Sequence, residues 1–314
     1  MNNFFISDSY NHFSHKKVSI MAVVRSSIDD IVKMIENVFS TCNDPSNIEM
    51  LIRMDDDDED VILLSINKIF HKYNIKLYVG FRHGYIGMHK YCNELISMAI
   101  GDIIFHWGDD GDILTNGWED ILAQHIGGVA VLQNMVHFHT DSGIQAVRKN
   151  NFSPVVPRSL YDILGTYSPC ALSDSYYDYI GEISGIKIMS GLDVLIHRGE
   201  MNKCGVEAWG HFASKENMEK IEEDAQKIIK YLDKKNICRR LIPYFEISSD
   251  PSPKVEVRGG PRNHRYVVKF FNKENGEVVF SKTIPRYNWV SCNNGKFVRV
   301  IDNGNIIFEH SFGS

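Results

Sequence analysis

The chain has 314 residues, 43% of them hydrophobic and 24% charged, and carries a net charge of −6. This composition is typical of a globular protein and excludes a disordered or fibrous chain, and the length fits about two domains. The N-terminus lacks a basic segment followed by an apolar stretch, and no apolar run approaches the roughly 18 residues of a membrane span. We therefore expect a cytoplasmic protein. The six cysteines form no CxxC pair, which argues against a disulfide framework or a structural zinc site.

Strands and helices are predicted to alternate through the first third of the chain. Short apolar runs rich in β-branched residues predict four strands, at 18–24, 48–54, 75–80 and 102–107. Helical periodicity separates them, first in a helix that begins after Ser26 or Ser27 and later over about 61–73. This alternation implies an α/β fold with a mostly parallel sheet and helices on both faces. In such sheets ligands bind at the carboxyl ends of the strands, where acidic residues here follow the second and fourth strands.

The rest of the chain changes character near residue 250. Further strands are predicted at 129–136 and 192–196, and an amphipathic helix at 215–235. The sequence SSDPSP (248–253) is the clearest linker. Beyond it the apolar period becomes two, and the pairs Asn275-Gly276 and Asn303-Gly304 each predict a β-hairpin. We therefore expect an α/β domain over residues 1–247 and a small β-sandwich-like accessory domain over 254–314.

Charge is distributed unevenly between these two parts. Residues 253–314 contain ten Lys and Arg against five Asp and Glu, which makes this tail +5 and leaves −11 for the first 252 residues. The acidic body argues against broad nucleic-acid binding, whereas the basic tail leaves an anionic partner possible. A solvated basic face is the simpler interpretation of the tail.

Three aspartates follow the fourth predicted strand directly, and they are candidate metal ligands. Asp109, Asp110 and Asp112 lie on one turn, where like charges repel unless a cation or many donors neutralise them. Carboxylate oxygens suit Mg²⁺ or Mn²⁺, which usually bridge a protein to substrate phosphates. A solvated acidic turn explains the same spacing equally well.

Other polar residues are candidates for the same crevice. Asp55 or Asp56, after the second strand, can accept hydrogen bonds from a nucleobase or a ribose. Arg82, just past the third strand, can meet a base or phosphates, although an exposed loop residue is an equal alternative. His197 ends a strand, and Asp174 lies upstream of it in a loop where it can serve as a base facing the crevice.

Three segments together carry a family resemblance, namely VSIMAVVR, IEMLIRMDDD and GYIGMHKYCNELISMAIGDIIFHWGDDGDIL. They resemble the nucleotide-binding half of inverting GT-A glycosyltransferases of family two. In that family the first strand ends in a short polar segment, the second in an aspartate that holds the base, and the fourth in a DxD-like metal motif. The matching residues here are Arg25, Asp55 or Asp56, and Asp109-Asp110. The resemblance places Arg25 and Asp109 on the nucleotide and Asp110 on the metal.

The resemblance covers roughly residues 16–235 and extends to two single residues of the later half. The family has a loop aspartate as catalytic base and then a histidine that reaches the metal or diphosphate, which Asp174 and His197 resemble. This chain reads DDG where D-x-D is common, so either Asp110 or Asp112 is the chief metal ligand. The tail resembles β-modules that accompany some bacterial and phage glycosyltransferases.

The resemblance implies a GT-A, Rossmann-like fold and an enzyme that moves a sugar from a nucleoside-diphosphate sugar to an acceptor hydroxyl with inversion. A UDP- or dTDP-sugar is the expected donor, a glycan, a protein or another hydroxyl compound the acceptor, and Mn²⁺ or Mg²⁺ the cofactor. One alternative is a sugar-nucleotide pyrophosphorylase-like nucleotidyltransferase, which would carry a glycine-rich basic loop where this chain has RSSIDD. The other is a non-catalytic carbohydrate- or nucleotide-binding protein, which has no need of a base at Asp174.

Overall fold

The computed structural model divides the chain into two compact units, Met1–Gly181 with Lys187–Asn236, and Glu182–Ile186 with Ile237–Ser314. It describes residues 4–8, 16–65, 67–140, 143–147, 153–197, 203–235, 237, 244–248, 254–258, 265–272, 277–285, 288–291, 297–302 and 305–311. Within the described residues, no helix is long and apolar enough to span a membrane.

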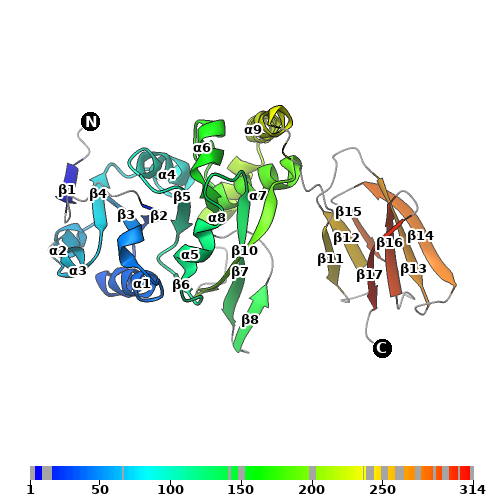
Figure 1. Ribbon diagram of the computed structural model, residues 1–314, viewed down its shortest axis with the longest axis horizontal. Helices are drawn as coiled ribbons and strands as arrows, with labels where there is room; N and C mark the ends of the chain where they lie inside the picture. Colours follow the sequence, from blue (N-terminus) through cyan, green and yellow to red (C-terminus); the bar gives the residue numbers. More distant parts are fainter. Residues whose placement is uncertain are drawn as a thin grey trace. The chain divides into compact units, whose positions relative to one another are not determined.

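A ten-stranded sheet forms the centre of the first unit (Figure 1). Its strands are β1 (Phe4–Asp8), β2 (Val18–Val23), β3 (Ile48–Asp55), β4 (Ile75–Gly80), β5 (Ile103–Trp107), β6 (Gly111–Ile113), β7 (Val131–Thr140), β8 (Gly143–Val147), β9 (Val155–Pro157) and β10 (Lys187–Ile196). They lie in the order β1-β4-β3-β2-β5-β9-β7-β10-β6, with β8 paired to β7. The neighbours β4, β3, β2 and β5 are mutually parallel, as are β7 and β10, whereas the remaining pairs are antiparallel.

Helices cover this sheet. They are α1 (Ile28–Ser40), α2 (Val61–Ser65), α3 (Ile69–Lys72), α4 (Met88–Ile96), α5 (Trp118–Ala123), α6 (Arg158–Leu164), α7 (Ser173–Ser184), α8 (Lys203–Phe212) and α9 (Lys215–Lys234), with 3₁₀ turns η1 (Pro45–Asn47) and η2 (Tyr85–Gly87). Helix α4 packs against β2 and β3, and in Figure 1 α1 lies on the other side of these strands. The predicted α/β fold is therefore confirmed.

Local sequence explains why α1 starts where it does. The Ser27 side chain caps the helix by accepting a hydrogen bond from the Asp30 backbone N–H, and Asp29 and Asp30 lie at the positive end of the helix dipole. One face of α1 is buried in the core, and its buried residues are Ile31, Met34, Ile35, Val38 and Phe39. This capping fixes the loop between β2 and α1, where Arg25 lies.

The stretch 61–73 is not the single helix that its periodicity predicts. The structure has two short helices, α2 and α3, with a break between them. The Asn67 side chain accepts a hydrogen bond from the Ile69 N–H at 3.0 Å, so it competes with the helical backbone and starts α3 separately.

The second unit contains two antiparallel sheets. One is β11 (Tyr244–Ser248), β12 (Lys254–Arg258) and β15 (Asn288–Ser291), and the other is β14 (Val278–Pro285), β13 (Arg265–Phe271), β16 (Phe297–Asp302) and β17 (Asn305–Ser311). β13 pairs with β14 and β16 with β17, which agrees with the two predicted hairpins, although Asn275-Gly276 and Asn303-Gly304 lie outside the described residues.

The division between the units falls earlier than the linker that the sequence suggests. Strand β11 ends at Ser248, the first residue of that linker, and pairs antiparallel with β12 after the linker, from Tyr244 opposite Arg258 to Ser248 opposite Lys254. Residues 248–253 therefore connect two strands of one sheet, and the first unit ends near residue 236 rather than at 247.

Candidate active site

Charged residues from four neighbouring strands meet at the carboxyl edge of the parallel part of the sheet. Arg25 follows β2, Asp55 ends β3, Arg82 follows β4 and Asp109 follows β5. Because these strands are parallel and adjacent, all four residues lie at the same edge. The structure thus brings together the four predicted nucleotide-binding positions.

Asp55 occupies the inner side of this group, with its side chain only 11% exposed. Its Oδ1 accepts a hydrogen bond from the Tyr91 hydroxyl at 2.8 Å. Its Oδ2 accepts one from the Arg25 guanidinium at 3.1 Å and lies 3.9 Å from Arg82 Nε. Arg53 Nη1 on β3 lies 3.8 Å from Oδ1. The carboxylate is therefore held in one orientation by polar groups from four different parts of the chain.

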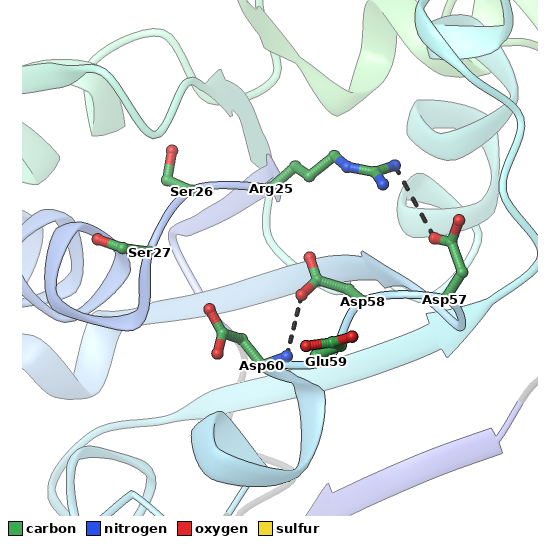
Figure 2. A pocket seen from close by; sticks show the side chains of 7 residues that line it. All are labelled: Arg25, Ser26, Ser27, Asp57, Asp58, Glu59 and Asp60. Atoms are coloured by element: carbon green, nitrogen blue, oxygen red, sulfur yellow. Dashed lines mark hydrogen bonds and ion pairs between the residues drawn. The ribbon is translucent and has the colours of Figure 1, made fainter.

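Asp57 completes a ring of ion pairs with Asp55 and the two arginines. Arg82 Nη1 lies 3.1 Å from Asp57 Oδ2, and Arg25 Nη1 lies 3.8 Å from Asp57 Oδ1. Each arginine thus contacts both aspartates. Figure 2 shows the Arg25 guanidinium turned toward Asp57.

The ring borders an open hollow of about 390 Å³ (Figure 2). Arg25, Ser26 and Ser27 line it from the start of α1, and the acidic run 57–60 lines it from the loop after β3. Asp58 accepts a hydrogen bond from the Asp60 N–H at 3.0 Å, so this part of the acidic run organises the turn that leads into α2.

Asp109 links the second acidic cluster to the same loop. One of its oxygens, Oδ2, accepts hydrogen bonds from the Ser26 hydroxyl and from the Arg25 backbone N–H, the latter at 3.3 Å. The loop after β2 therefore contacts Asp55 through the Arg25 side chain and Asp109 through its backbone. These contacts bring the two acidic strand ends into one site.

Two of the three predicted metal ligands, Asp112 and His197, have side chains in contact, and Asp110 meets His197 through its backbone. His197 Nε2 is 2.8 Å from Asp112 Oδ2, across the antiparallel pair of β6 and β10. The His197 N–H donates to the Asp110 carbonyl at 2.8 Å. A Cβ at Gly108 would lie 2.7 Å from Asp110 Oδ1, so the Asp110 carboxylate would have to move to admit it.

These residues supply the kinds of ligand that a divalent cation takes, one imidazole and two carboxylates. Among the described residues, no group of three or more His, Cys, Asp or Glu side chains is gathered as a metal site. The Asp112 and His197 pair fits a Mg²⁺ or Mn²⁺ ion that takes its other ligands from substrate phosphates and water. That Asp110, Asp112 and His197 together bind a metal ion stays a prediction.

Asp174 lies in the first turn of α7 and has an unusual pKa. Burial raises the pKa of its carboxyl to about 6, with a smaller contribution from the charge of Asp178 and opposition from the Ser175 backbone N–H. The start of α7 is tied to β5, since the Ser173 hydroxyl lies 3.2 Å from His106 Nδ1. His106 is three residues before Asp109, so this contact places the start of α7 beside the carboxyl end of β5.

Asp56, the alternative to Asp55, takes a different position. Its side chain is exposed, and its backbone N–H donates to the Gly80 carbonyl at 2.8 Å, which continues the pairing of β3 with β4. The structure therefore favours Asp55 as the residue inside the site.

Several site residues were not identified from the sequence, among them Ser26, Asp57 and Tyr91. Tyr91 lies on α4, and nothing in its local pattern distinguishes it from a core aromatic residue. The sequence marks Ser26 only as a residue before the first helix, and nothing in the acidic run distinguishes Asp57 from its neighbours. Contacts between loops that are far apart in the chain give these residues their roles.

No protein-family model and no curated protein matches the sequence. Solved structures do resemble the chain. S. aureus TarS 1-349 in complex with UDP-GlcNAc is 15% identical, with 71% of this chain and 74% of that chain covered and a TM-score of 0.48. Mannosyltransferase PcManGT from Pyrobaculum calidifontis in complex with GDP-Man and Mn²⁺ is 11% identical, with 71% and 76% covered and a TM-score of 0.44. S. aureus TarS is 11% identical over 95% of this chain and 78% of that chain, with a TM-score of 0.43.

Proposed function

We propose that this chain is a glycosyltransferase that takes a sugar from a nucleoside-diphosphate sugar and transfers it to an acceptor hydroxyl. The observation that carries the proposal is the convergence of Arg25, Asp55, Arg82 and Asp109 at the carboxyl ends of four adjacent parallel strands. The pair of Asp112 and His197 extends that edge. A site with fixed donors and acceptors on one side and metal-binding groups on the other suits a nucleoside diphosphate.

In this proposal Asp55 and the arginines hold the nucleoside. The outer oxygen of Asp55 accepts an N–H of the base, and the Arg25 and Arg82 guanidiniums donate to base carbonyls or phosphates. Asp109 keeps the loop after β2 in place through Ser26 and the Arg25 N–H. A UDP- or dTDP-sugar is the donor that we propose.

Asp112 and His197, with Asp110 beside them, would hold a Mg²⁺ or Mn²⁺ ion near the diphosphate. When bound, such an ion stabilises the negative charge that develops on the leaving phosphate. An imidazole ligand favours Mn²⁺ over Mg²⁺. The protein contributes a pair of ligands whose atoms are 2.8 Å apart.

Asp174 is the proposed general base. An acceptor hydroxyl must lose its proton as it attacks the anomeric carbon, and a base on the face opposite the leaving group gives inversion in a single displacement. A carboxyl with a pKa of about 6 is ionised near neutral pH and is more basic than an ordinary aspartate. Its raised pKa supports this role.

The test measures release of nucleoside diphosphate from a panel of UDP-, dTDP- and GDP-sugars, with Mn²⁺, with Mg²⁺ and with a chelator. We expect turnover with at least one uracil or thymine donor and a loss of turnover in Asp55→Ala. Formation of nucleoside triphosphate from the sugar nucleotide and pyrophosphate would instead indicate a nucleotidyltransferase. Tight nucleotide binding without any product from acceptor mixtures would indicate a binding protein.

A further inference from the structure

The hydroxyl of Tyr91 joins the nucleotide-binding carboxylate to the loop after β4. It accepts hydrogen bonds from the backbone N–H groups of His83 at 2.6 Å and Gly84 at 3.0 Å. It donates to Asp55 Oδ1 at 2.8 Å. A phenol has one hydrogen and two acceptor directions, so two N–H donors leave the hydrogen to point at Asp55.

Tyr91 is fixed in this position by a buried network. Tyr91 is 2% exposed, and the Arg53 guanidinium lies 4.9 Å from the centre of the Tyr91 ring. Arg53 Nε donates to Glu94 at 2.9 Å, and Glu94 is 3.0 Å from His83 Nε2. Burial, and then the hydrogen bond to Asp55, raise the pKa of Tyr91, so the hydroxyl keeps its proton and remains a donor.

Asp55 consequently presents two unequal oxygens. The inner oxygen, Oδ1, has two partners on the buried side, since it accepts the Tyr91 hydrogen bond and lies 3.8 Å from Arg53 Nη1. The outer oxygen, Oδ2, lies 3.1 Å from Arg25 and 3.9 Å from Arg82. An entering base therefore meets a single acceptor with two guanidinium donors close by.

This pattern distinguishes bases by their hydrogen-bonding edges. Uracil and thymine present one N–H between two carbonyl acceptors, which complements one acceptor oxygen accompanied by two donors. Guanine presents an N–H and an amino group side by side, and a carboxylate satisfies these two donors only when both of its oxygens are available.

We propose that Tyr91 is a specificity-determining residue that makes the site select uracil or thymine nucleotides over guanine nucleotides by occupying Asp55 Oδ1. The inference rests on the proposed function, because it requires a nucleobase at Asp55. Tyr91 contacts no substrate in this role and acts by positioning Asp55.

The experiment compares UDP and GDP binding to the full-length wild-type protein and to Tyr91→Phe by calorimetry. The wild type should bind UDP more tightly than GDP by about tenfold or more, since an unsatisfied polar group costs that much affinity. Tyr91→Phe removes the hydroxyl donor and leaves Oδ1 with only the longer, 3.8 Å ion pair to Arg53. The preference should therefore fall by about tenfold, chiefly through tighter GDP binding. An unchanged preference in a folded Tyr91→Phe protein overturns the proposal.

Tyr176→Phe is the matched control. It removes a similar buried hydroxyl–carboxylate bond, from Tyr176 to Asp224 Oδ2 at 3.0 Å, on helices α7 and α9. Its UDP and GDP affinities should keep the wild-type ratio, and a ratio that shifts as far as in Tyr91→Phe overturns the proposal by showing a general effect of destabilisation.

If Tyr91→Phe does not fold, the wild-type affinities can still overturn the proposal. Equal affinity for UDP and GDP, with both lost in Asp55→Ala, overturns the role of Tyr91 and leaves the proposed function standing. Absence of binding for UDP, dTDP and GDP contradicts the proposed function itself.

Discussion

Replacing Asp174 by Asn should change both the transfer rate and the pH dependence of the protein. With a pKa of about 6, Asp174 is ionised in most molecules at pH 7 and in few at pH 5. If the ionised form is the base, kcat/KM should fall about tenfold between pH 7 and pH 5. Asp174→Asn keeps the side-chain shape but accepts no proton, so transfer should fall by roughly 10² to 10⁴ and the acidic limb should disappear.

The same pKa has a consequence for stability. The carboxyl titrates near 3.8 in the unfolded chain and near 6 in the folded protein, so the folded state holds more protons between these values. The free energy of unfolding therefore decreases as the pH rises through this window. The full difference corresponds to at most about 3 kcal/mol at pH 7, and solvent around the partly exposed carboxylate reduces it to on the order of 1 kcal/mol. Asp174→Asn should be more stable than the wild type at pH 7 by that amount, and the advantage should vanish below pH 4.

The assay pairs product formation from pH 5 to 8 with urea unfolding at pH 4 and pH 7 on the same preparations. Asp178→Asn is the informative control, because the Asp178 charge helps to raise the Asp174 pKa. That variant should retain transfer, and its fall in kcat/KM at acidic pH should occur at a lower pH than in the wild type. Near-wild-type transfer by Asp174→Asn, or a variant less stable than the wild type at pH 7, would refute the reasoning. In the first case the base lies elsewhere, with Asp178 and Glu182 the next residues to test.

Three further changes test other parts of the site. Gly108→Ala places a Cβ 2.7 Å from Asp110 Oδ1 and should weaken Mn²⁺-dependent UDP binding, measured by calorimetry, more than it lowers the melting temperature. His197→Ala removes one partner of the pair with Asp112 and should raise the Mn²⁺ concentration needed for half-maximal turnover by about tenfold or more. A chain ending at residue 236 keeps α9 and the whole edge of the site, so it should unfold cooperatively and bind UDP, whereas insolubility would show that the second unit is needed for folding.

The strands at the centre of the first unit could be predicted because burial imposes a simple pattern on them. Every residue of β3 is buried, and its sequence is correspondingly apolar before Asp55 except at two positions, Glu49 and Arg53. The exceptions are explained only by tertiary contacts. Glu49 receives hydrogen bonds from Ser19 and Lys76, and Arg53 pairs with Glu94. The sequence could place a carboxylate at the strand end but not the groups that orient it.

The position of each strand end along the sheet was predictable, whereas the contacts between loops were not. Parallel order alone brings Asp55 and Asp109 to one edge, because the carboxyl ends of adjacent strands coincide there. That Asp57 joins both arginines depends on how the loop after β3 turns, and that Tyr91 reaches Asp55 depends on how α4 packs. These contacts join residues that are 25 and 36 positions apart in the sequence, and no local sequence pattern predicts them.

The two aspartates of the ring of ion pairs, Asp55 and Asp57, differ in how exposed they are to solvent. Asp57 is 47% exposed, and its contacts are ion pairs in solvent, which contribute little free energy individually. Asp55 is 11% exposed and keeps a buried hydroxyl donor in addition to its arginine. A base carbonyl or phosphate that approaches Arg25 or Arg82 can therefore replace Asp57 at small cost, while Asp55 stays in place. Under the proposed function, Asp57 would hold both guanidiniums near the positions from which they donate to the nucleotide, which would reduce the side-chain entropy lost on binding.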